Sequence, residues 1–123
     1  MENTINITKK QANTLINNLF SNDSNFHINK TLYKHLKNLK ASLLLTVLLE
    51  KESKERHLGI IKKGFFLRQQ DIQKVTGLSP YHQRTSIKLL EEKQIITVER
   101  AGAPATNYFT INHSRIQDIL LQA

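Results

Sequence analysis

The chain has 123 residues, and its 18 lysines and arginines outnumber its 10 aspartates and glutamates, which gives a formal net charge of +8. This length predicts one domain with a core of its own and leaves no room for a second full domain. The absence of cysteine excludes disulfides, a thiol nucleophile and a cysteine-based zinc site. A small basic chain favours a polyanionic partner.

The sequence shows no signal for secretion or for a membrane. The first residues, MENTINITKKQ, lack the apolar stretch of a secretory signal, and the longest apolar run is interrupted by Thr46. We therefore expect a cytoplasmic protein. The positive charge lies mostly in residues 1–63, which carry a net charge of +6, whereas residues 64–123 carry +2.

Residues 1–25 predict a helix over 7–20 followed by a polar linker. Thr8 and Gln11 fit a capping box, and apolar residues then recur at helical spacing up to Leu19. The serines and asparagines of residues 21–25 favour turns over helix. This segment either folds back on the rest of the chain or forms a dimer contact.

Residues 26–58 predict a very short strand at 26–28 and then two helices. Asn29 is a candidate cap for a first helix that continues through Leu39, and the leucine-rich run from residue 40 to 55 predicts a central buried helix. On one helix, four lysines would lie along one stripe: Lys30, Lys34, Lys37 and Lys40. Such a stripe is either an ordinary solvated face or a phosphate-facing surface.

Residues 59–121 predict a loop, a strand, two helices, two strands and a last helix. The loop lies between Gly59 and Gly64, the strand at 65–68 and the next helix at 69–75, which ends at Gly77. Ser79 caps a helix to about residue 93, with Pro80 in its first turn. Strands at 95–100 and 106–111 flank the turn at 101–105, and the last helix covers 113–121.

Two helices joined by a tight glycine-containing turn predict a helix-turn-helix, and the hairpin after them corresponds to a wing. The pieces TGLSPYHQRTSIKLLEEKQII and GAPATNYFTIN carry this pattern within residues 65–112. This stretch resembles the winged-helix domains of bacteria and phages, and most closely the small phage and plasmid replication proteins related to DnaD-like replisome organisers. Such folds often carry glycine where Gln94 stands here. FHINKTLYKHLKNLKASLLLTVLLEKE resembles the first helices of that group.

The resemblance implies a mainly α chain with a small β-hairpin, an α+β winged helix-turn-helix domain over residues 26–123. It also implies DNA binding in replication initiation or in transcriptional regulation of a phage or other mobile element. On this pattern we expect duplex DNA as the partner in preference to single-stranded DNA, and replication proteins are further candidate partners. A homodimer is expected, because one short recognition helix reads few base pairs.

Helix geometry selects the candidate DNA-binding side chains. If Ile87 and Leu90 face the core, Gln83 lies partly inward and the other polar residues around it point outward. Arg84 suits guanine, whereas Gln83 or His82 suits base-edge acceptors. The full set of candidate DNA-binding residues is Arg68, Gln69, Ser79, Tyr81, His82, Gln83, Arg84, Thr85, Lys88, Arg100 and Asn107. Four lysines are further candidates for contacts with the DNA backbone: Lys34, Lys37, Lys62 and Lys63.

These residues also have simpler interpretations. Tyr81 fits a core aromatic, and Arg84 and Lys88 fit plain solvated charges. The alternative function is a protein-interaction module of a replication complex, with the winged helix or the leucine-rich helix as its contact surface. The five histidines lack metal-ligand spacing and the four glycines build no phosphate loop, so we expect neither an enzyme nor a cofactor or metal.

Overall fold

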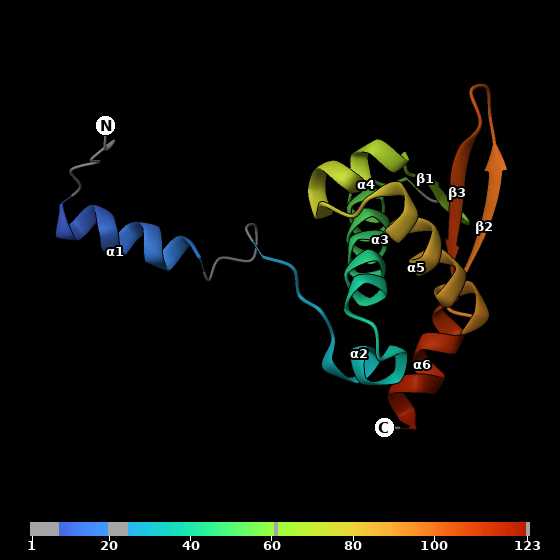
Figure 1. Ribbon diagram of the computed structural model, residues 1–123, viewed down its shortest axis with the longest axis horizontal. Helices are drawn as coiled ribbons and strands as arrows, with labels where there is room; N and C mark the ends of the chain where they lie inside the picture. Colours follow the sequence, from blue (N-terminus) through green and yellow to red (C-terminus); the bar gives the residue numbers. More distant parts are fainter. Residues whose placement is uncertain (1–7, 20–24, 61, 123) are drawn as a thin grey trace.

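The computed structural model describes residues 8–19, 25–60 and 62–122. Over these ranges the chain is α+β, with six helices and one three-stranded antiparallel sheet, which confirms the α+β part of the predicted fold class (Figure 1). The elements in chain order are α1 (Lys9–Asn18), α2 (Lys30–Leu36), α3 (Leu39–His57), β1 (Phe65–Phe66), α4 (Gln69–Thr76), α5 (Pro80–Glu92), β2 (Ile96–Ala101), β3 (Thr106–Ile111) and α6 (His113–Leu121).

The capping box predicted for the first helix is confirmed at α1. The Gln11 side chain accepts from the Thr8 backbone N–H at 2.8 Å, and the Thr8 hydroxyl oxygen accepts from the Gln11 N–H at 3.1 Å. No α1 residue is buried, and α1 stands clear of the other elements (Figure 1). Residues 7 and 20–24 of the predicted helix and linker lie outside the described residues.

Two predictions for residues 26–40 are wrong. Residues 26–28 form no strand, and the helix that Asn29 caps ends at Leu36 instead of continuing through Leu39. Lys37 takes a left-handed conformation with φ 53°, and the Asn38 side chain starts a new helix by accepting from the Ala41 N–H at 2.9 Å. The chain therefore turns between α2 and α3, and the four lysines cannot form a single helical stripe.

The prediction of a central buried helix is confirmed by α3, which passes through the middle of the body (Figure 1). Leu44, Leu45 and Leu48 are almost fully buried and belong to one core cluster with residues of α2, α4, α5, α6 and all three strands. Phe65 of β1 stacks against Phe109 of β3 with ring centroids 6.0 Å apart. This core fixes the helices against one face of the sheet.

Helices α4 and α5 form on either side of the turn that the sequence predicted. Gly77 ends α4 with φ 76°, a conformation that glycine adopts without steric cost. The Ser79 hydroxyl oxygen accepts from the His82 N–H at 3.2 Å and caps α5, whose first residue is Pro80. The predicted end of α4 and start of α5 are therefore both confirmed.

The sheet has the strand order β1-β3-β2, with β3 antiparallel to both neighbours. Ile96 pairs with Ile111 at the base of the β2–β3 hairpin and Ala101 pairs with Thr106 near its turn. The hairpin projects beyond the body beside α5 (Figure 1). It therefore forms a wall next to one side of that helix.

The last helix, α6, lies at the end of the body away from the tip of the β2–β3 hairpin (Figure 1). Asn112 caps it by accepting from the Arg115 N–H at 3.2 Å, and the Arg115 side chain donates to the Lys93 carbonyl at 3.1 Å. Ile116 and Ile119 join the core. Across the ranges given above, every helix is too short or too polar to cross a bilayer.

Candidate functional site

An open groove with a volume of about 870 Å³ lies between helices α4 and α5 and the β2–β3 hairpin. It brings together seven of the residues singled out from the sequence, which come from three separate segments of the chain. These are Arg68, Gln69, Gln83, Arg84, Lys88, Arg100 and Asn107. Its other lining residues are Gln70, Gln73, Ile87, Glu91, Val98, Pro104, Ala105 and Thr106.

The outer face of α5 presents the polar residues that helix geometry placed there. Gln83, Ser86 and Leu90 are buried on the opposite face. Arg84 and Lys88 are exposed, and neither side chain forms a hydrogen bond or ion pair with any residue that the structure describes. Both charges are therefore available to a ligand in the groove.

Tyr81 is not a core aromatic, because 62% of its surface is exposed. Its ring lies edge-on to the His82 ring, with the centroids 5.4 Å apart. The Lys40 amino group approaches the same imidazole, 3.1 Å from its Nε2. The start of α5 therefore carries an exposed aromatic ring beside a lysine contributed by α3.

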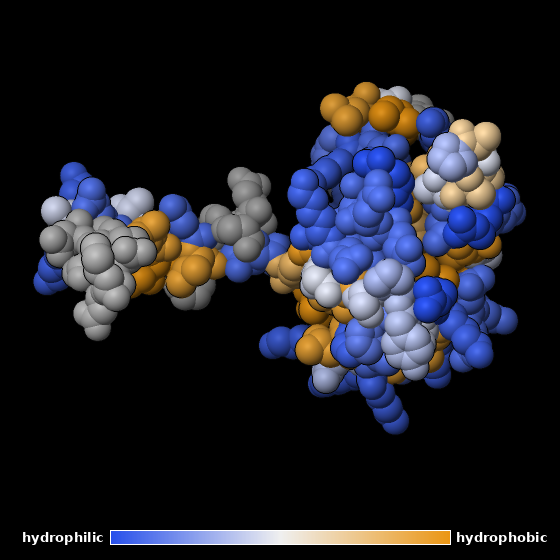
Figure 2. Space-filling view, turned by 45° about the horizontal axis from the view of Figure 1, so that its top comes forward, coloured by the Kyte–Doolittle hydropathy of each residue, from blue (hydrophilic) through white to orange (hydrophobic). Residues whose placement is uncertain are grey.

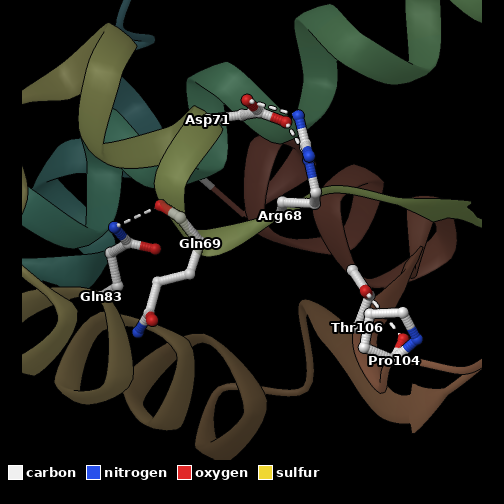
Figure 3. A network of polar contacts seen from close by, with 6 residues as sticks. All are labelled: Arg68, Gln69, Asp71, Gln83, Pro104 and Thr106. Atoms are coloured by element: carbon white, nitrogen blue, oxygen red, sulfur yellow. Dashed lines mark hydrogen bonds and ion pairs between the residues drawn. The ribbon is translucent and has the colours of Figure 1, made fainter.

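Gln83 requires a correction, because the structure removes it from the set of base-reading candidates. The side chain is 1% exposed, and its Nε2 donates to the Gln69 carbonyl at 3.0 Å and to the Leu78 carbonyl at 2.9 Å (Figure 3). Residue 83 follows the buried periodicity of Ser86 and Leu90, so it faces inward. Its amide holds the start of α4 against α5 from within.

Arg68 stands at the upper end of the groove, immediately before α4. Its Nε donates to Asp71 Oδ2 at 2.9 Å and its Nη2 to Oδ1 at 3.3 Å (Figure 3). The Arg68 and Asp71 side chains are 61% and 42% exposed, so solvent screens this pair and it contributes little to stability. A phosphate near Arg68 would compete with the Asp71 carboxylate for the guanidinium.

The hairpin wall of the groove is held by Arg100 and Thr106. Arg100 Nη2 donates to the Ala105 carbonyl at 3.1 Å, and the Arg100 Nη1 lies 3.5 Å from Asn107 Oδ1. The Thr106 hydroxyl donates to the Pro104 carbonyl at 3.4 Å (Figure 3). The Arg100 guanidinium therefore joins β2 to the turn and to β3, and Arg100 lines the groove.

The groove lining is cationic and rich in amides. Four cationic side chains line it, Arg68, Arg84, Lys88 and Arg100, against the single carboxylate of Glu91. Gln70 and Gln73 of α4 were missed from the sequence. Their spacing of three places both on one side of a helix, but which side faces the hairpin depends on long-range packing.

The remaining candidates on α5 make local contacts. The Ser79 hydroxyl is a confirmed cap, and the Thr85 hydroxyl donates to the His82 carbonyl at 3.1 Å. These two side chains and that of His82 lie outside the groove lining.

The lysines of the first half lie away from the groove. Lys34 is on α2 and Lys37 is its left-handed end, both exposed. Lys62 lines a small hollow with Glu52, Glu55 and Arg56, and Lys63 is exposed on the same loop. None of these four lysines lines the groove that Arg84 and Lys88 share.

The residues that the structure describes include no group of three or more histidines and carboxylates placed to hold a metal ion. Comparison of the chain with protein-family models, with curated proteins and with solved structures found no match.

Proposed function

We propose that residues 26–123 form a winged-helix domain that binds duplex DNA. The observation that carries this proposal is the groove between α5 and the β2–β3 hairpin, where Arg68, Arg84, Lys88 and Arg100 converge. A helix has the width of the major groove, and a hairpin beside it reaches the neighbouring backbone. In this arrangement α5 would be the recognition helix and the hairpin the wing.

The contacts divide by chemistry. Arg84 and Tyr81 stand on the exposed first half of α5, where side chains of a recognition helix meet base edges. Lys88, Arg68 and Arg100 supply charge to the phosphates and thereby position the protein. Glu91, one turn further along α5, would repel phosphate, so the DNA would contact the first part of the helix and diverge from its end.

The biological setting that fits this domain is replication initiation or transcriptional control in a phage or other mobile element, in the cytoplasm. This follows from the resemblance of residues 65–112 to replication proteins of such elements. The alternative is a protein-interaction module of a replication complex, which the exposed Leu15, Ile16 and Leu19 of α1 favour.

Titration of a labelled duplex at two salt concentrations tests the proposal. Affinity should fall steeply with salt. Arg84→Ala with Lys88→Ala should weaken binding and reduce the slope of log affinity against log salt by about one, because only Lys88 of the two contacts phosphate. The charge-matched control is Lys30→Ala with Lys54→Ala, two exposed lysines outside the groove. Absence of binding to duplex and single-stranded DNA near physiological salt would favour the protein-interaction module.

A further inference from the structure

Helix α1 has the pattern of a helix that binds in a groove. Ala12, Leu15, Ile16 and Leu19 follow the spacing i, i+3, i+4, i+7, and the three larger side chains are 57%, 52% and 64% exposed. Figure 2 shows these apolar side chains gathered on α1 beside polar ones. A helix of 10 residues is marginal in water on its own, so α1 needs a partner surface.

The body has an apolar groove of about 260 Å³ next to the segment that leads to α1. Ile28, Leu32, Leu45 and Leu49 line it, and Glu50 stands among its lining residues. Thr46 is also in the lining, and its hydroxyl donates to the Ser42 carbonyl of its own helix at 2.8 Å. The groove therefore offers apolar surface with one carboxylate.

The charges of the two surfaces are complementary. Lys9 and Lys10 form the first turn of α1, which contains no acidic residue, and cations there oppose the helix dipole. Glu50 at the groove would offset this unfavourable charge. The match between a basic helix start and the single carboxylate of this apolar groove selects α1 as the occupant.

We propose that α1 of one copy of the chain lies in the groove around Leu49 of a second copy, and that the exchange is reciprocal. Segment 25–29 leads away from the body and α1 stands beyond it, where a second copy can receive it (Figure 1). A two-fold exchange covers both apolar surfaces on both copies with one self-complementary contact. It is independent of DNA binding, because no residue that lines the groove beside α5 takes part.

Light-scattering mass measurements on the full chain test the exchange. The wild type should be a dimer, and either Ile16→Asp in α1 or Leu49→Asp in the groove should weaken dimerisation roughly tenfold or more, because a buried side chain becomes charged. The matched control is Val75→Asp, since Val75 is 58% exposed on α4 and should leave the mass unchanged. Circular dichroism checks that each variant keeps its helices.

A mixture of Ile16→Asp and Leu49→Asp chains is the decisive sample. One intact helix and one intact groove remain between the two chains, so a heterodimer should form where each variant alone is monomeric. If Leu49→Asp does not fold, Glu50→Lys is the second groove variant and should weaken the dimer. Adding Lys9→Glu and Lys10→Glu to the Glu50→Lys chain should restore the dimer. Three results would overturn the exchange. The wild type could be a monomer, both groove variants, Leu49→Asp and Glu50→Lys, could each remain dimeric, or the mixture could remain monomeric.

Discussion

The side-chain amide of Gln83 in α5 donates to the backbone carbonyl of Gln69 at the start of α4 at 3.0 Å. The same nitrogen donates to the carbonyl of Leu78 in the turn between the two helices. One side chain therefore joins both helices and their turn. These contacts fix the position of the start of α4 relative to α5.

Replacing Gln83 with leucine should lower the free energy of unfolding by about 1–3 kcal/mol, because the Leu78 carbonyl loses its buried donor. Urea unfolding followed by circular dichroism measures the change. Gln73→Leu on the exposed face of α4 is the matched control and should stay within about 0.5 kcal/mol. Equal effects of the two substitutions would contradict the structural role of Gln83.

Replacing Gln94 with glycine should stabilise the fold. It joins α5 to β2 with φ 63°, a left-handed conformation that costs a non-glycine residue about 1–2 kcal/mol, part of which the entropy of glycine cancels. We expect Gln94→Gly to raise the free energy of unfolding by about 0.5–1 kcal/mol. Lys93→Gly, at φ −81°, should lower it instead, and thermal unfolding of both variants shows whether the signs differ.

The local elements of this chain were predictable because their boundaries are chemical. Thr8, Asn29, Gly77 and Ser79 each end or begin a helix through a cap or a left-handed turn, and each was identified from its residue type. The break after Lys37 was missed, although Asn38 is a cap of the same kind as Asn29. A lysine in a left-handed conformation gives no sequence signal, and the leucine spacing continued across it.

The candidate groove was only partly predictable, because it depends on packing between distant segments. Helix periodicity placed Arg84 and Lys88 outward, and the structure agrees. Periodicity did not reveal that Gln83 would be fully buried, since its donor role needs the Gln69 carbonyl, 14 residues earlier. The facing of Gln70 and Gln73 toward the hairpin likewise follows from how α4 packs, which no local pattern encodes.

Gly64 should tolerate no side chain, for a reason other than backbone conformation. A Cβ on this residue would collide with the carbonyl oxygen of Phe109 and come within 2.8 Å of the Tyr108 ring, while the Gly64 N–H donates to the Tyr108 hydroxyl at 2.9 Å. Gly64→Ala should cost about 2–3 kcal/mol of unfolding free energy. Gly59→Ala, which meets open space at φ 77°, should cost only about 1 kcal/mol in the same urea titration.

His35 should make the fold sensitive to acid. Its Nε2 is buried with no hydrogen-bond partner among the described residues, and burial, with Lys93 and Arg115 nearby, lowers its pKa below the ordinary 6.5. The unfolded chain therefore binds a proton that the folded chain resists, so the free energy of unfolding should fall as the pH drops below about 6.5.

Urea unfolding at a series of pH values measures this dependence. His35→Leu removes the titrating ring and should flatten the loss of stability below pH 6.5, the ordinary pKa of the ring. The same substitution at His57, which is exposed at the end of α3, is the control and should preserve the wild-type dependence. A dependence that survives in His35→Leu would assign the acid sensitivity to other groups.

Substitutions of Arg100 test whether its charge or its position on the hairpin matters in the proposed DNA complex. Its guanidinium donates to the Ala105 carbonyl and to Asn107 Oδ1 while Arg100 lines the groove, and a lysine cannot reproduce both of these contacts in the same geometry. If Arg100 contacts phosphate, Arg100→Ala should reduce the salt slope of duplex binding by about one, whereas Arg100→Lys should keep the slope. Fluorescence titrations at several salt concentrations measure both. If Arg100 only braces the hairpin, the two variants will weaken binding equally and leave the slope at its wild-type value, because no phosphate contact is lost.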